Sequence, residues 1–246
     1  MAQKVVFAGS VEITVAESGL TPAQAFVRYA LSIGALKFEP EYPRKWFQTK
    51  IGRRSPYFFN SGLFNTAKCL EVLAVAFGEA IEARYEETEL PDVIYGPAYK
   101  GIQIATVVAG SLALGYEDYN PGVAYNRKEV KDHGEGGLLV GVDMRGKRVL
   151  LVDDVITSGG SKREALGFIR LAGGIPIGCI IAFDRQEIGE AGTLSATQEF
   201  TQMTGLPIYA AATLGDLIQV LEEGPAVPGG LEALPHIVAY RDQYGV

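Results

Sequence analysis

Apolar residues recur with the spacing of amphipathic helices in two early segments of the chain. Residues 21–24 have the composition of a helix start: a capping Thr, Pro at the first helical position and Gln three residues after the cap. Phe26, Ala30 and Ile33 continue this helix at helical spacing. A second amphipathic pattern at residues 66–85 is formed by Leu70, Leu73, Ala74, Phe77 and Ile81. Both segments are predicted to be helices with one buried face.

Further along, short apolar runs alternate with helical patterns. The runs cover residues 93–95, 149–152, 178–183 and 207–212. Helical patterns follow three of them, one through Leu114, one from about Ser161 and one over residues 214–222. Apolar strands that alternate with helices predict a parallel sheet covered on both faces. Ligands bind beyond the carboxyl ends of such strands, where the turns at residues 96–101 and 153–161 fall.

Length and composition narrow the class of protein. The 246 residues suit one large domain, and we expect an N-terminal extension at residues 1–20 and a single domain over residues 21–246. Lys and Arg number 22 against 29 Asp and Glu, and this net charge of −7 argues against a nucleic-acid partner. No signal peptide opens the chain, and no apolar stretch reaches the roughly 18 residues of a membrane span. We therefore expect a cytoplasmic protein without membrane contact.

The two cysteines, Cys69 and Cys179, each lie among apolar neighbours. They lack the paired spacing of a zinc site. A long-range disulfide is the alternative, but two buried free thiols in a reducing compartment are the better prediction.

The most informative segment is residues 149–161, where a buried strand delivers Asp153 and Asp154 to the edge of the sheet. The next turn offers three hydroxyl side chains, closely spaced backbone N–H groups and the positive end of a helix. These are the parts of a phosphate-binding site. The two carboxylates would suit the vicinal hydroxyls of a ribose, directly or through a divalent cation.

A plain strand-to-helix turn, in which Ser161 and Glu164 form only a capping box, is the alternative for this segment. It leaves Asp153 and Asp154 unexplained, because paired acids at the end of an apolar strand repel each other without a ligand or an ion. A Walker loop is excluded, since no Gly-Lys-Ser/Thr follows at the required spacing.

The same segment resembles the phosphoribosyl diphosphate (PRPP) motif of the type I phosphoribosyltransferases: an apolar strand, two acids, two aliphatic residues, Thr and small residues. Residues 52–62, 96–102 and 125–137 resemble orotate phosphoribosyltransferases in particular, and residues 184–187 agree. Several motifs in the right order are far more specific than one. The resemblance runs from about Phe26 to the C-terminus. It implies an α/β fold of the type I phosphoribosyltransferase kind, with a central parallel sheet flanked by helices and a small hood subdomain.

The resemblance implies transfer of the ribose 5-phosphate group of PRPP to N1 of orotate, which gives orotidine 5′-monophosphate and diphosphate in UMP synthesis. The residues that it places at PRPP are Lys50, Tyr99, Lys100, Arg127, Lys128, Lys131, His133, Asp153, Asp154, Val155, Ile156, Thr157, Ser158, Gly159, Gly160 and Ser161. Lys131, Lys100, Asp153 and Asp154 are the predicted catalytic residues. Mg²⁺ is expected to be carried with PRPP, without a dedicated protein site.

At the orotate base the resemblance places Phe58, Phe59, Thr157 and Arg185. Phe58 and Phe59 are consecutive aromatics in a predicted strand, so core packing is the alternative for at least one of them. Arg185 directly follows the strand at residues 178–183. It is either a surface cation or the partner of the orotate carboxylate, which a planar bidentate donor fits well.

Residues 127–137 combine charges of both signs with three glycines, and Val130 is their only apolar side chain before Leu138. Such a charged run is typical of a solvated loop or of a lid over a diphosphate. The resemblance favours the lid. It also implies a homodimer in which Lys128, Lys131 and His133 reach the active site of the neighbouring subunit.

Three other functions are compatible with parts of the pattern. A uracil or purine phosphoribosyltransferase gives no reason for a carboxylate-directed Arg185. A PRPP-sensing protein that binds RNA conflicts with the net charge of −7. A nucleotide-binding protein without transferase activity does not require the charged lid. Two features depart from the family pattern: the extension at residues 1–20, and Gly160 at a position where a hydroxyl residue is common.

Overall fold

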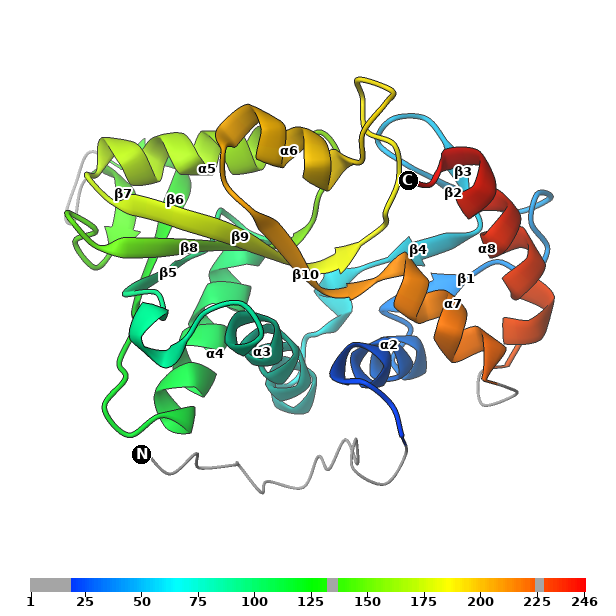
Figure 1. Cartoon of the computed structure of the whole chain (residues 1–246), viewed down its shortest axis with the longest axis horizontal. Helices are drawn as coiled ribbons and strands as arrows, with labels where there is room; N and C mark the ends of the chain where they lie inside the picture. Colours follow the sequence, from blue (N-terminus) through cyan, green and yellow to red (C-terminus); the bar gives the residue numbers. More distant parts are fainter. Residues whose placement is uncertain (1–18, 132–136, 224–227) are drawn as a thin grey trace.

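Figure 1 shows a computed structural model of the chain, which describes residues 19–131, 137–223 and 228–246. Its centre is a six-stranded sheet with the order β10-β9-β8-β5-β6-β7. The strands are β5 (Val93–Tyr95), β6 (Gly122–Lys131), β7 (Gly137–Gly141), β8 (Arg148–Val155), β9 (Ile175–Asp184) and β10 (Ile208–Thr213). Neighbouring strands are parallel except β6 and β7, which are antiparallel. The predicted α/β fold around a mostly parallel sheet is confirmed.

Helices cover both faces of this sheet (Figure 1). They are α2 (Pro22–Ser32), α3 (Ala67–Glu82) and α4 (Lys100–Gly115) on one side, and α5 (Gly160–Leu171) and α6 (Ala196–Thr204) on the other. Successive side chains of a strand point to opposite faces. Leu150 and Val152 of β8 therefore join the core beneath α3 and α4, while Val149 and Leu151 join the core beneath α5.

A smaller group of elements lies beside the sheet and is the hood that the resemblance implies (Figure 1). It contains two short antiparallel pairs, β1 (Leu36–Phe38) with β4 (Tyr57–Phe59) and β2 (Phe47–Gln48) with β3 (Arg54–Ser55). The helices α7 (Leu214–Glu222) and α8 (Gly230–Tyr244) pack against each other next to it. Elsewhere, two short 3-10 helices connect the larger elements: η1 (Ser61–Leu63) follows β4, and η2 (Glu87–Glu89) precedes β5.

The predicted helix starts are confirmed. The Thr21 side chain accepts a hydrogen bond from the backbone N–H of Gln24, and the Gln24 side chain accepts one from the backbone N–H of Thr21. Thr66 caps α3 in the same way, through the backbone N–H of Cys69. Cys69 and Cys179 are buried free thiols, as expected.

Two local predictions are wrong. Residues 127–131 are not a loop: they end strand β6, which pairs with β7 at Asn126 and again at Lys131, with an irregularity in the register between them. Asp153 and Asp154 lie within β8, not after it, because pairing with β9 continues to Val155. The alternative interpretation of the next turn is excluded as well: the capping box of Ser161 and Glu164 does not form, and none of the described side chains caps α5, which begins after a left-handed Gly159.

Some predictions concern parts of the chain outside the described residues. They concern residues 1–18 of the extension and residues 132–136, which include His133. For Lys131, only the backbone is described. Within the described ranges, no helix is long and apolar enough to cross a membrane.

Candidate active site

The carboxyl end of β8 carries two acidic side chains, each paired with a different lysine. Asp153 Oδ2 lies 2.6 Å from Lys162 Nζ, and Asp154 Oδ2 lies 2.9 Å from Lys100 Nζ. The expected repulsion between the two acids is therefore offset by ammonium groups of the chain itself, without the ligand or ion that the sequence seemed to require.

The two lysines differ sharply in exposure. The Lys162 side chain is 2% exposed and the Lys100 side chain is 52% exposed, although the two carboxylates are similarly sheltered. Sequence reasoning missed Lys162. A signal was present, because Lys162 precedes Ala165, Leu166 and Ile169 at helical spacing and so lies on the buried face of α5.

Asp154 is held ionised by its neighbours. Ser61 Oγ donates to Asp154 Oδ2 at 2.9 Å, and the backbone N–H of Val155 donates to Oδ1 at 2.8 Å. Burial alone would raise the pKa of Asp154, but the hydrogen bond and charge of Lys100, with Ser61, outweigh it and lower the pKa below its usual value. Ser61, from η1, is a second site residue that the sequence did not single out.

The turn after β8 is shaped to receive an anion at the start of α5. Gly159 adopts a positive φ of 69°, which favours glycine, and it starts the helix. Arg163 Nη1 donates to the carbonyl oxygen of Ser158 at 2.7 Å and fixes the turn from outside. The first N–H groups of a helix and its dipole attract phosphate. A Cβ on Gly160 would meet Ser158 Oγ at 3.8 Å and Arg163 Nη2 at 3.9 Å, both ordinary contacts, so the glycine is not required there by packing.

The turn after β5 brings Lys100 to the acids. A Cβ on Gly96 would collide with the carbonyl oxygen of Gly101, so only glycine fits where the turn folds against the start of α4. The buried Asn126 on β6 supports the turn, since its Oδ1 accepts hydrogen bonds from Ala98 N at 3.3 Å and from the Tyr95 hydroxyl at 3.1 Å. Tyr99 is 73% exposed at the tip. Asn126 is a third supporting residue that the motifs alone did not identify.

Strand β6, which pairs with β7, carries two more of the predicted cations, Arg127 and Lys128. Arg127 Nη1 donates to the carbonyl oxygen of Gly137 at 2.9 Å and ties the two strands together. Lys128 is exposed on β6. The place of Arg127 and Lys128 at the diphosphate stays a prediction.

Arg185 lies in a buried polar network, which excludes the surface-cation alternative. Its Nε and Nη2 donate to Glu187 Oε1, with Nε at 2.8 Å, and Nη2 lies 2.9 Å from Ser55 Oγ. Its guanidinium stacks over the Tyr57 ring at 4.3 Å, and the Tyr57 hydroxyl donates to Glu187 Oε1 at 3.0 Å. Glu187 and Ser55 engage at most three of the five guanidinium donors, so N–H groups remain for a carboxylate ligand.

The two consecutive phenylalanines have different surroundings. The Phe59 ring is 7% exposed and stacks on Phe183 at 5.5 Å, so the core-packing alternative describes it. The Phe58 ring is 38% exposed and stacks on Phe47 at 5.5 Å. Phe58 is therefore the better placed of the two to meet a planar base, and base contact by either stays a prediction.

Lys50 and Thr157 complete the predicted set. Lys50 is exposed between β2 and β3, and Thr157 is half-buried in the turn after β8. The contacts of Lys50 with PRPP and of Thr157 with orotate stay predictions.

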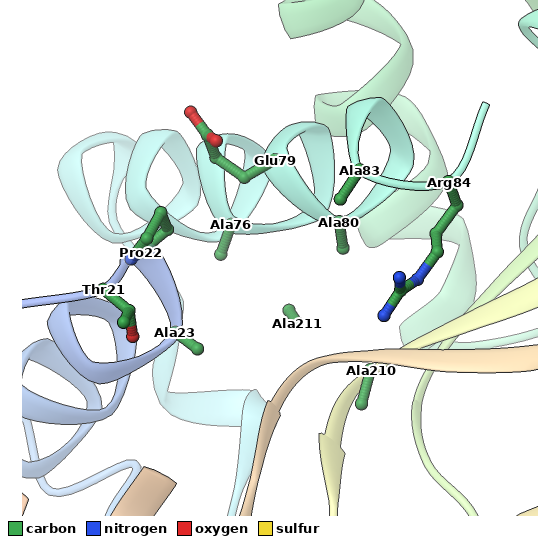
Figure 2. Close-up of a pocket in the computed structure, with 10 residues that line it drawn as sticks. All are labelled: Thr21, Pro22, Ala23, Ala76, Glu79, Ala80, Ala83, Arg84, Ala210 and Ala211. Carbon is green, nitrogen blue, oxygen red and sulfur yellow. The ribbon is translucent and has the colours of Figure 1, made fainter. Parts of the chain in front are cut away.

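A separate cavity of about 230 Å³ lies between α2, α3 and β10 (Figure 2). Alanines form much of its wall, and Thr21, Glu79 and Arg84 lie at its margins. None of the predicted site residues lines it, so it does not belong to the site at the end of β8.

Comparisons with known proteins agree with this arrangement. Residues 71–191 match the family described as the phosphoribosyl transferase domain. The chain is 47% identical over 222 residues to the orotate phosphoribosyltransferase of Stenotrophomonas maltophilia, covering 90% of this chain and 95% of the relative. It is 48% identical over 223 residues to that of Chromobacterium violaceum, covering 91% and 97%. The crystal structure of the Francisella tularensis orotate phosphoribosyltransferase superposes with a TM-score of 0.74 at 32% identity, covering 90% of this chain and 99% of that one.

Proposed function

The chain belongs to the orotate phosphoribosyltransferase family, and from this premise we propose how its residues divide the reaction among them. The enzyme transfers the ribose 5-phosphate group of PRPP to N1 of orotate and releases diphosphate. The observation that carries the assignment of residues is the 2.9 Å contact between Lys100 Nζ and Asp154 Oδ2. It joins the two turns that the sequence predicted to hold PRPP.

The reaction builds charge of opposite sign on two parts of the substrate. As the bond between ribose C1 and the leaving oxygen breaks, the sugar ring becomes positive and the diphosphate becomes more negative. Preorganised charges of the protein stabilise such a transition state best. Asp153 and Asp154 are proposed to hold the ribose hydroxyls and to favour the positive ring, with Asp154 kept ionised by Lys100 and Ser61.

The turn of residues 155–161 is proposed to hold the 5′-phosphate. Its backbone N–H groups point from the start of α5, and Thr157, Ser158 and Ser161 add hydroxyl donors. Because backbone groups carry this binding, the absence of a hydroxyl at Gly160 has little effect.

Lys100 is proposed to exchange its partner during the reaction, leaving Asp154 for the diphosphate. Its exposed ammonium makes this exchange possible. Tyr99, Arg127, Lys128, Lys131, His133 and Lys50 are proposed to complete the binding of PRPP. Mg²⁺ carried with PRPP would supply further positive charge at the diphosphate. Asp153 and Asp154 already face lysines, so a cation there competes with an ammonium group, which favours a cation held chiefly by the phosphates.

At the base, Arg185 is proposed to bind the carboxylate of orotate while Phe58 packs on the ring and Phe59 and Thr157 complete the pocket. Glu187, Ser55 and Tyr57 hold the guanidinium before the substrate arrives. Arginine offers the planar pair of donors that a carboxylate fits.

The first experiment follows the ultraviolet absorbance of orotate with PRPP and Mg²⁺, with uracil and adenine in parallel. Loss of orotate that requires both PRPP and Mg²⁺ is the expected result. Arg185→Lys should then raise the KM for orotate about tenfold and leave the KM for PRPP within about twofold. Turnover of uracil in place of orotate would contradict the roles of Arg185 and Phe58.

A cytoplasmic homodimer with shared sites is the final part of the proposal. Lys131→Ala and Asp154→Ala would each be inactive alone, because they remove groups of the same active site. If Lys131 acts in the neighbouring subunit, a mixture of both variants should regain about a quarter of the wild-type activity, since half of the dimers carry one intact site. No recovery after mixing and subunit exchange would contradict the shared site.

A further inference from the structure

Lys162 is a buried lysine beside the PRPP turn, and the reaction as assigned above does not use it. Its side chain is 2% exposed, in the first turn of α5. It lies on the same helix face as Ala165, Leu166 and Ile169, which are core residues. An apolar residue would continue this face, so the lysine needs a physical explanation.

The ammonium of Lys162 joins the helix to the end of β8. Its Nζ lies 2.6 Å from Asp153 Oδ2 and donates to the carbonyl oxygen of Val155, also at 2.6 Å. The other carboxylate oxygen of Asp153, Oδ1, accepts the backbone N–H of Asp154 at 2.9 Å. One side chain thus bridges the two ends of the turn at residues 156–161.

Stability is a weak reason to bury this pair. Removing two charges from water costs several kcal/mol per ion, and replacing a buried ion pair by apolar residues is often neutral or stabilising. The pair provides hydrogen bonds of fixed direction, which an apolar contact does not. Both oxygens of Asp153 and the carbonyl of Val155 have fixed donors, so the strand end and the first turn of the helix keep one geometry.

We propose that Lys162 is a positioning residue of the PRPP site, which sets the spacing between the acids that hold the ribose and the turn that holds its 5′-phosphate. The proposal rests on the assignment of PRPP to this turn. Lys162 itself does not contact the substrate: it acts through Asp153 and Val155. Because Lys162 fixes Asp153, Asp154 with its exposed partner Lys100 is the acid whose contacts change during the reaction.

The test compares Lys162→Met with Lys68→Met, a matched change at an exposed lysine in the first turn of α3. Initial rates give the KM for PRPP and for orotate, and calorimetry gives the Kd of ribose 5-phosphate. We expect Lys162→Met to raise the KM for PRPP and the Kd of ribose 5-phosphate about tenfold, because a small loss of alignment costs binding at both groups. The KM for orotate should stay within about twofold. Lys68→Met should match the wild type.

A fall in thermal stability with unchanged PRPP and ribose 5-phosphate constants would overturn the proposal, because Lys162 would then be structural only. If Lys162→Met does not fold, Lys162→Gln retains N–H donors toward Asp153 without the charge. For that variant, amide hydrogen exchange at residues 156–161 should accelerate while exchange in β9 stays unchanged, and uniform exchange would overturn the proposal. Ribose 5-phosphate binding needs no orotate. If the wild type failed to consume orotate, the binding comparison would still decide the role of Lys162.

Discussion

The two ion pairs at the end of β8 are made of the same chemical groups in opposite surroundings. Lys162 and Asp153 are both sheltered, whereas Lys100 meets Asp154 from a half-exposed position. The buried pair is fixed by further contacts with the strand. The exposed pair can open, because water can replace either partner. The difference supports the proposal that one of the two acids maintains the geometry of the site while the other exchanges its partner when the substrate binds.

The largest contrast is expected in stability. Asp153→Ala leaves the Lys162 ammonium buried without its counter-charge and should lower the free energy of unfolding by about 3–5 kcal/mol. Asp154→Ala should cost about 1 kcal/mol or less, because Lys100 can turn to water. Urea unfolding of both variants and the wild type measures the difference. Equal losses of unfolding free energy in the two variants would contradict the difference between the buried and the exposed pair.

For the exposed pair, we expect a large effect on activity and a small effect on stability. Lys100→Met should lower kcat/KM for PRPP about 100-fold, since it removes a positive charge proposed to meet the leaving diphosphate. Its free energy of unfolding should change by about 1 kcal/mol or less. Lys68→Met, which removes an exposed lysine elsewhere, is the matched control. Unchanged turnover in Lys100→Met would exclude Lys100 from the chemistry.

The pH dependence of stability should follow the exposed pair. The pKa of Asp154 is lower in the folded protein than in the unfolded chain, so its contribution is present above the unfolded pKa of about 3.9 and lost as the pH falls through the folded value. In Lys100→Met, burial dominates and the pKa of Asp154 should rise. The wild type should therefore exceed the variant in stability at pH 6, and the gap should close toward pH 3. Unfolding curves across this range measure it.

The smallest effect is expected from salt. Raising the ionic strength from 0.1 to 1 M shortens the Debye length from about 10 to about 3 Å, which screens exposed charges far more than buried ones. A double-mutant cycle for Lys100 and Asp154 should lose about half of its coupling energy, and a cycle for Lys162 and Asp153 should keep its own. Similar salt sensitivity in both cycles would show that the two pairs are equally accessible.

Much of the fold was predictable because its signals are local. The Thr21 cap, the strand over residues 93–95 and the helix Leu214–Glu222 follow from residues close together in sequence. Both turns of the site were also predictable, since parallel strands bring their carboxyl ends to one edge. The meeting of Lys100 with Asp154, 54 residues apart, confirms that argument.

What the sequence did not reveal depends on pairing across space. Residues 127–131 look like a loop because of their charges, and only the pairing of β6 with β7 on either side of them shows that they continue a strand. Asp153 and Asp154 seemed to need a ligand because their lysines come from two different helices. Arg185 looked like a possible surface cation because Glu187 and Ser55 close around it only in the folded chain.

The close approach of Gly96 to the backbone of Gly101 also limits which substitutions the gene can tolerate at this position. Every codon change at Gly96 that alters the amino acid adds a Cβ where a carbonyl oxygen already lies, so no substitution is conservative there. Gly160, in the other turn of the site, has room for a side chain. In a saturation library selected for growth without added pyrimidine, the Gly96 position should therefore keep a single amino acid, while Gly160 should accept alanine and serine. Neutral substitutions would then be tolerated in the turn proposed to hold the phosphate and eliminated at Gly96, in the turn that presents Lys100.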